Sequence, residues 1–99
     1  MRIGVGKITL DFYNNENVAL KHKCLQDLFK DIKKQFNLSI DEVADFDDPE
    51  RCVIGFSFIV SESWNTLNIR KLLDKICETI DQTAFARVTS EDHEILRFD

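Results

Sequence analysis

Few side chains of the types that catalyse reactions or bind metals stand close together in this 99-residue sequence. The two histidines, His22 and His93, share no spacing with other ligands that is typical of a metal site. The three cysteines, Cys24, Cys52 and Cys77, are far apart and form no C-x-x-C pair. No serine or cysteine stands beside a base that would activate it as a nucleophile. We therefore expect no catalytic site, no bound metal and no cofactor.

An acidic turn is the one segment that resembles a binding loop for a divalent cation. Its carboxylates surround a single proline and belong to Asp45, Asp47, Asp48 and Glu50. The spacing lacks the central glycine and the final glutamate of an EF-hand loop. The chain also has no glycine-rich phosphate loop. A solvated turn is therefore the favoured interpretation.

The composition predicts a single globular domain over residues 1–99. Apolar residues make up 43% and charged residues 31%, which is typical of a folded chain of this length. Each cysteine falls in or beside an apolar run, where an unpaired thiol behaves as a small hydrophobic side chain. The sequence shows no apolar leader and no stretch long enough to span a bilayer. Together these features favour a cytoplasmic protein without membrane contact.

Charge is divided unevenly along the chain, whose net charge is −5. Residues 1–40 carry seven Lys/Arg against four Asp/Glu (+3), and residues 41–99 carry six against fourteen (−8). Two solvated faces of different charge are the simpler interpretation of this pattern. The alternative is a basic patch on the first helix that meets an anionic partner.

Apolar residues that alternate with period two predict strands, and apolar residues that recur at three and four positions predict helices. Asn17 is a suitable capping residue for the first helix, and Ser63 for the second. The tail over residues 91–99 is expected to add an extended stretch. The predicted strands cover residues 2–12, 38–46, 51–61 and 84–90, and the predicted helices cover residues 18–36 and 64–82.

The order β-α-β-β-α-β predicts an α+β fold of the ferredoxin-like kind, a four-stranded antiparallel sheet with two helices on one face. Phe56 and Phe58 share the parity of Ile54, so we expect all three to face the helices. The helix-free face then has no aromatic platform on which RNA bases could stack. It is instead suited to an interface with another protein or with a second copy of the chain. The residues predicted for this interface are Ile3, Val5, Val53 and Ile59.

Several short motifs fall in one register with a known family. Residues 36–43 read F-N-L-S-I-D-E-V and are followed by Arg51 and by Ile54-Gly55; L-D-K-I at 73–76 and E-I-L at 94–96 come later. This run resembles the bacterial YlxP-like family (domain of unknown function, family 503), whose members read F-N-V-S-V-A-E-V. The sequence departs from the family at Leu20, which replaces a capping glutamate, and at Asp48-Pro49, which replace Leu-Trp.

The resemblance implies a ferredoxin-like fold and a poorly defined function. Members are often encoded beside translation and ribosome-assembly factors, which implies a link to RNA or the ribosome. The charged residues that fit the family pattern are Lys21, Glu42, Asp47 and Arg51. The structural interpretation is that Lys21 pairs with Glu42 or Asp47.

Two functions remain open at this point. In the first, the chain is a non-enzymatic binding module that works with ribosomal RNA or ribosome-assembly proteins. Its phosphate contacts would come from Lys21, Lys23, Lys33 and Arg51. In the second, the chain is a protein-interaction or homodimerisation subunit that uses the helix-free face and has no nucleic-acid role.

Overall fold

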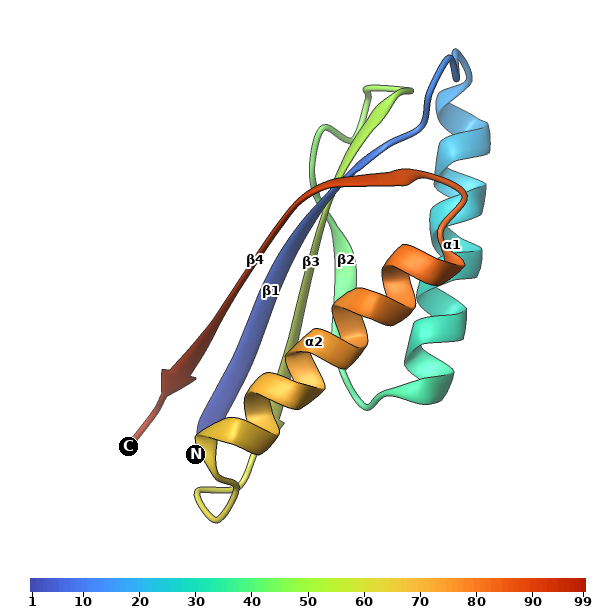
Figure 1. The fold of residues 1–99 in the computed structure, drawn as a ribbon. Helices are drawn as coiled ribbons and strands as arrows, with labels where there is room; N and C mark the ends of the chain where they lie inside the picture. The colour runs from blue at the N-terminus through green and yellow to red at the C-terminus, as the bar shows by residue number, and fades with distance from the viewer.

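A computed structural model describes all residues 1–99, and it confirms the predicted ferredoxin-like α+β fold (Figure 1). The sheet has the strand order β2-β3-β1-β4, and every neighbouring pair is antiparallel. The two long central strands are therefore β1 and β3. In chain order the elements are β1 (Arg2–Asp11), α1 (Val18–Gln35), β2 (Ser39–Ala44), β3 (Arg51–Val60), α2 (Thr66–Thr83) and β4 (Arg87–Arg97).

Capping residues set where both helices begin. The side chain of Asn17 accepts a hydrogen bond from the Leu20 amide, so α1 begins at Val18 as predicted. The second helix begins two residues later than predicted, because Asn65 rather than Ser63 accepts from the Asn68 amide. Neither helix is both long and apolar enough to cross a membrane.

The last strand is longer than the predicted strand over residues 84–90. The predicted extended tail is part of β4, which pairs with β1 along the whole length of β1. A β-bulge opposite Thr9 and Leu10 shifts the register by one residue. After the bulge, His93 and Ile95 pair with Gly6 and Gly4, so their side chains share the helix side of the sheet.

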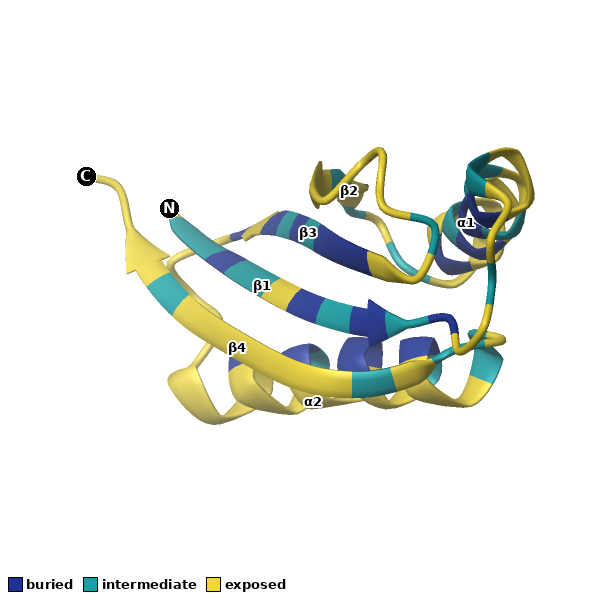
Figure 2. Ribbon diagram, turned by 90° about the horizontal axis from the view of Figure 1, so that it is seen from above, coloured by how far each residue is buried: buried dark blue, intermediate teal, exposed yellow.

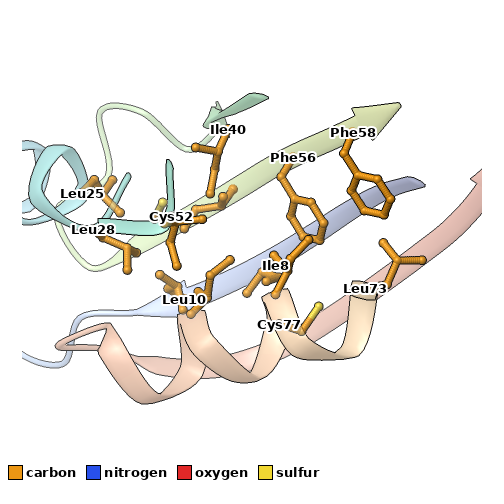
Figure 3. Packing of buried hydrophobic residues seen from close by; sticks show 14 of the residues in the cluster. Ile8, Leu10, Leu25, Leu28, Ile40, Cys52, Phe56, Phe58, Leu73 and Cys77 are labelled. Carbon is orange, nitrogen blue, oxygen red and sulfur yellow. The ribbon is translucent and has the colours of Figure 1, made fainter. Parts of the chain in front are cut away.

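The hydrophobic core lies between the sheet and the two helices. Figure 2 shows the buried residues of α2 turned toward β1. Figure 3 shows Ile8 of β1, Phe56 of β3 and Leu73 of α2 in the core between the sheet and α2. Phe56 and Phe58 are both buried, which confirms that they point inward. Their rings lie over glycines of β1: a Cβ added at Gly6 would stand 2.2 Å from the Phe56 ring. Glycine is therefore required there by close approach.

Candidate functional site

The most unusual side chain of the structure is Lys21, which has 0% exposed surface. It projects from the inward face of α1, one turn before Leu25, into the loop that joins β2 to β3. Its Nζ lies 2.9 Å from Oε2 of Glu42. It also donates to four backbone carbonyl oxygens of the loop, at 2.9 Å for Asp45, 3.0 Å for Phe46, 2.6 Å for Asp48 and 3.1 Å for Arg51.

These contacts decide the role of Lys21. Its three N–H groups are shared among five oxygens, so no donor is left for another ligand. The predicted ion pair with Glu42 is confirmed. The alternative that Lys21 contacts phosphate is wrong, because the ammonium is sealed inside the loop. The Lys21 ammonium instead holds the loop oxygens together, as a bound metal ion does in a metal-binding loop.

The surrounding loop is held by further hydrogen bonds. Asp48 Oδ1 accepts from the backbone amides of Glu50 and Arg51, and the side-chain Nδ2 of Asn15 donates to the Pro49 carbonyl at 2.7 Å. Asp45 has a φ of 61°, a left-handed conformation that aspartate tolerates better than most residues. The loop is therefore ordered by its own chain, and no group of three His, Cys, Asp or Glu side chains converges to hold a metal ion.

Arg51 and His22 are also bound into this loop. The Arg51 guanidinium pairs with Asp45 at 2.9 Å, which offsets its charge within an acidic segment. The His22 ring packs on Phe46, with 4.1 Å between ring centroids, and its Nε2 lies 2.8 Å from the Phe46 carbonyl oxygen. Arg51 is therefore a weaker phosphate contact than the sequence suggested.

Two buried thiols are held in their protonated form. Burial and the neighbouring Glu42 carboxylate raise the pKa of the Cys52 thiol far above its ordinary value. Burial, with smaller effects of Glu91 and Asp74, raises the pKa of Cys77 to about 11. Because the thiolate is the nucleophile, these cysteines are inert at neutral pH.

The basic surface of α1 lies outside the loop. Its lysines are all exposed, and none of them forms an ion pair within 4.0 Å. Lys33 and Lys34 stand in the last turn, where their positive charges interact favourably with the negative end of the helix dipole. The exposed lysines are Lys23, Lys30, Lys33 and Lys34.

The helix-free face carries a row of three apolar side chains. Ile3 pairs directly with Ile59 on β3 and with Leu96 on β4, so the three side chains are neighbours on one face. Ile59 is 68% exposed and Leu96 is 40% exposed. We call these three residues the apolar row. Sequence reasoning missed Leu96, because the strand that carries it was assigned only as an extended tail.

The remaining residues predicted for this face differ in exposure. Val5 is half-buried beside the apolar row, between Ser57 and Glu94. Val53 is only 7% exposed, so it offers almost no surface to a partner, and its assignment to an interface is corrected. Val43 of β2 is exposed and covers Gly55, where an added Cβ would stand 2.8 Å from its Cγ1. It is a second apolar residue that the prediction missed.

Charges of both signs lie beside the apolar row on the same face. Lys7 stands directly opposite Asp92 in the β1–β4 register, and Glu94 lies two residues farther along. None of these three side chains forms an ion pair within 4.0 Å. Together with Val5 they line a shallow hollow of about 410 Å³.

Solved structures similar to this chain share its fold. A crystal structure of a candidate chlorite dismutase matches with a TM-score of 0.51 and 11% identity, over 96% of this chain and 44% of that one. The chain thus spans less than half of that protein. A dimeric ferredoxin-like protein from an uncultured marine organism matches with a TM-score of 0.48 and 17% identity, over 100% and 99% of the two chains. At 11% identity the likeness to the first of these structures shows the fold alone.

A transposase associated with REP sequences, solved with a REP hairpin, matches with a TM-score of 0.48 and 10% identity, over 98% of this chain and 57% of that one. No curated protein matches the chain. One family model does match, over residues 3–93, and its description is a protein of unknown function, DUF503. That match includes the motifs at 36–43 and 73–76, and the chain therefore belongs to the DUF503 family, which the YlxP-like resemblance indicated.

Proposed function

We propose that this chain is a non-enzymatic cytoplasmic binding module that forms a homodimer through its helix-free sheet face. The observation that carries the proposal is the apolar row, Ile59–Ile3–Leu96, which crosses three neighbouring strands with Ile59 and Leu96 exposed and Ile3 half-buried between them. Covering apolar surface contributes about 25 cal/mol per Å² removed from water. The two helices already bury the opposite face, so this one is free for a partner.

The charges on this face support a second copy as the partner. In a two-fold interface each patch meets itself, so a self-complementary patch needs both signs of charge. Lys7 supplies the cation, and Asp92 and Glu94 supply the anions. Because none of them is paired within the chain, Lys7 of one copy is free to pair with the acidic residues of the other.

The size of the face also suits a dimer. Ten residues of strand extend about 33 Å, and four strands about 4.8 Å apart make a face about 19 Å wide. That is about 600 Å² before the relief of side chains is added. Stable interfaces bury about 1,200–2,000 Å² in total, so two such faces reach the lower end of that range. The three free cysteines are consistent with a reducing compartment.

The proposal predicts that Ile59→Lys turns a dimer into a monomer. Light scattering at about 100 µM, well above the micromolar range in which modest interfaces dissociate, should give twice the 11.5 kDa chain mass for the unaltered protein. It should give the single-chain mass for Ile59→Lys, because each copy would then place an ammonium group in an apolar contact. Leu67→Lys is the control, since Leu67 is 60% exposed on α2 and lies off the face.

The dimer should persist in high salt, because its central contact is apolar. A monomeric mass for the unaltered protein would contradict the proposal. A dimeric mass for Ile59→Lys would place the interface elsewhere. Circular dichroism of each variant separates loss of the dimer from loss of the fold.

A second candidate is binding to ribosomal RNA or a ribosome-assembly complex through α1, favoured by its exposed lysines without ion pairs. Lys23→Glu with Lys33→Glu should then remove the protein from ribosome fractions at low salt. The control is Lys71→Glu with Lys75→Glu, the same charge change on exposed positions of α2. Binding should weaken steeply with salt, because phosphate contacts release counterions. Equal loss with the α2 pair would show a general charge effect and sink this candidate.

A further inference from the structure

A cavity of about 410 Å³ lies between the first turns of α2 and the outer strand β4, on the helix side of the sheet. Only two of the eight residues that line it are hydrophobic. Four are arginine or histidine, and three of these four come from residues 41–99, the acidic part of the chain. The lining residues are Arg2, Thr66, Arg70, His93, Glu94, Ile95, Leu96 and Arg97.

Three separate elements bring the arginines of this cavity together. Arg2 and Arg97 stand directly opposite each other in the β1–β4 register, so their side chains share one face. Arg70 stands one helical turn after Thr66 on α2. Glu94 lies between His93 and Ile95 on β4, so strand alternation turns its carboxylate toward the helix-free face. Glu94 nevertheless lines the cavity, so three guanidiniums and one carboxylate border it.

Two of the arginines are held in place by neighbouring groups. Arg2 Nη1 donates to Thr66 Oγ1 at 3.0 Å, and its side chain is only 24% exposed. Arg97 Nε lies 2.9 Å from Asp99 and 3.6 Å from Glu62. The chain's amino terminus donates to Glu62, and this hydrogen bond, with Arg97 and Arg2, lowers the pKa of that carboxyl. Glu62 therefore stays ionised and orients both arginines.

Arg70 is the cation left after the ion pairs are counted, because His93 lies 3.5 Å from an Asp74 carboxylate oxygen; Glu94 adds one negative charge to the lining. Arg70 forms no ion pair within 4.0 Å, and Glu62 is shared by Arg2, Arg97 and the amino terminus. The positive end of the α2 dipole adds to this charge, because the first turn of that helix has no acidic residue. A guanidinium is planar and donates two parallel hydrogen bonds to a tetrahedral oxyanion.

We infer that this arginine pocket binds the phosphate group of a nucleotide or of an RNA end. Three guanidiniums line this pocket, and a phosphate, with its several oxygens, can accept hydrogen bonds from more than one of them. A volume of about 410 Å³ also lies within the range of small-ligand sites. Arg2 and Arg97 share the helix side of the sheet, whereas Leu96 and Glu94 line the pocket and also belong to the helix-free face.

Isothermal titration of the full chain tests the pocket with pyrophosphate, with a 5′-phosphorylated RNA hexamer and with the same hexamer lacking the phosphate. Arg70→Gln should weaken binding at least tenfold, because it removes the guanidinium that has no partner in the chain. Lys71→Gln is the matched control: it removes one charge from the neighbouring exposed residue, which does not line the cavity. It should leave the affinity within twofold.

Each outcome of this titration either identifies the source of the phosphate group or overturns the inference. Tighter binding of the phosphorylated hexamer than of pyrophosphate identifies an RNA end as the ligand. Binding of pyrophosphate alone identifies a free nucleotide or diphosphate. No binding at millimolar concentration overturns the inference, and so does an equal effect of Arg70→Gln and Lys71→Gln. The single tryptophan, Trp64, whose carbonyl accepts from Arg2, supplies an independent fluorescence signal.

Discussion

Replacing Lys21 with methionine is expected to lower the free energy of unfolding by about 3–5 kcal/mol, the usual effect of removing one partner of a buried ion pair. Methionine fills a similar volume but donates no hydrogen bond. The Glu42 carboxylate and four loop carbonyls would then lack the ammonium that now contacts all of them. Urea denaturation followed by circular dichroism measures the change.

Lys23→Met is the matched control, because Lys23 is exposed on the same helix and forms no ion pair. It should change the free energy of unfolding by less than about 0.5 kcal/mol. If Lys21→Met also falls within 1 kcal/mol of the unaltered protein, the loop does not depend on its internal ammonium.

A double variant separates the ion pair from the carbonyl contacts. Lys21→Met with Glu42→Gln removes both charges, so no unpaired ion remains buried. We expect it to recover only part of the loss caused by Lys21→Met, since the loop carbonyls still lack a donor. Full recovery would mean that the ion pair alone matters and that the four carbonyl contacts contribute nothing.

The protein should lose stability steeply above pH 9. Cys77 has an ordinary pKa of 9.0 and a native pKa of about 11, and the pKa of Cys52 is raised in the same direction. Above pH 9 the unfolded chain releases thiol protons that the native chain keeps, so the unfolded state binds fewer protons and is favoured as the pH rises. Each thiol then lowers the free energy of unfolding by up to about 1.4 kcal/mol per pH unit.

Urea denaturation at pH 8, 9, 10 and 10.5, with a reductant, measures this slope. The variant Cys52→Ala with Cys77→Ala is less stable at pH 8, because it leaves small cavities. Its stability should nevertheless fall less steeply above pH 9 than that of the unaltered protein. The same slope in both proteins would mean that the buried thiols do not cause the alkaline loss.

Much of the fold follows from short-range pattern. The alternation along β1 and β3 places Phe56 and Phe58 on the side of Ile54, and the structure buries all three there. The spacing along α1 places Lys21 on its buried stripe, and the sequence predicted an ion pair with Glu42 or Asp47; the structure pairs Lys21 with Glu42. Periodicity reports which face a side chain occupies, and that is enough to place these residues.

Contacts that depend on backbone direction in a loop were not predictable in the same way. Four carbonyls converge on Lys21 only because the turn after Asp45 adopts a particular path, including one left-handed residue. Composition marked this segment as an acidic turn and gave no sign of an internal cation. Lys21 and Glu42 fit the family pattern, and in the structure they build the loop rather than contact a ligand.

The arginine pocket was also beyond the reach of the sequence. Arg2 and Arg97 are opposite each other only because β4 pairs with the full length of β1, and the bulge near Thr9 sets which side chains face α2. A net charge of −8 over residues 41–99 concealed this local concentration of arginines. The net charge of a chain segment therefore does not reveal a local charged patch when the fold brings distant residues together.

The central claim is that the helix-free face meets a second copy of the chain. A spin label attached to the cysteine of a Ser57→Cys variant tests this claim most directly. Ser57 lies on this face beside Val5, and Cys24→Ser leaves Cys52 and Cys77 as buried native thiols. Face-to-face pairing puts two sheets about 10 Å apart, so the two labels should lie within about 35 Å by double electron–electron resonance. Adding Ile59→Lys should abolish this coupling. Absence of any coupling between Ser57 labels, in a protein that is dimeric by mass, would contradict the account.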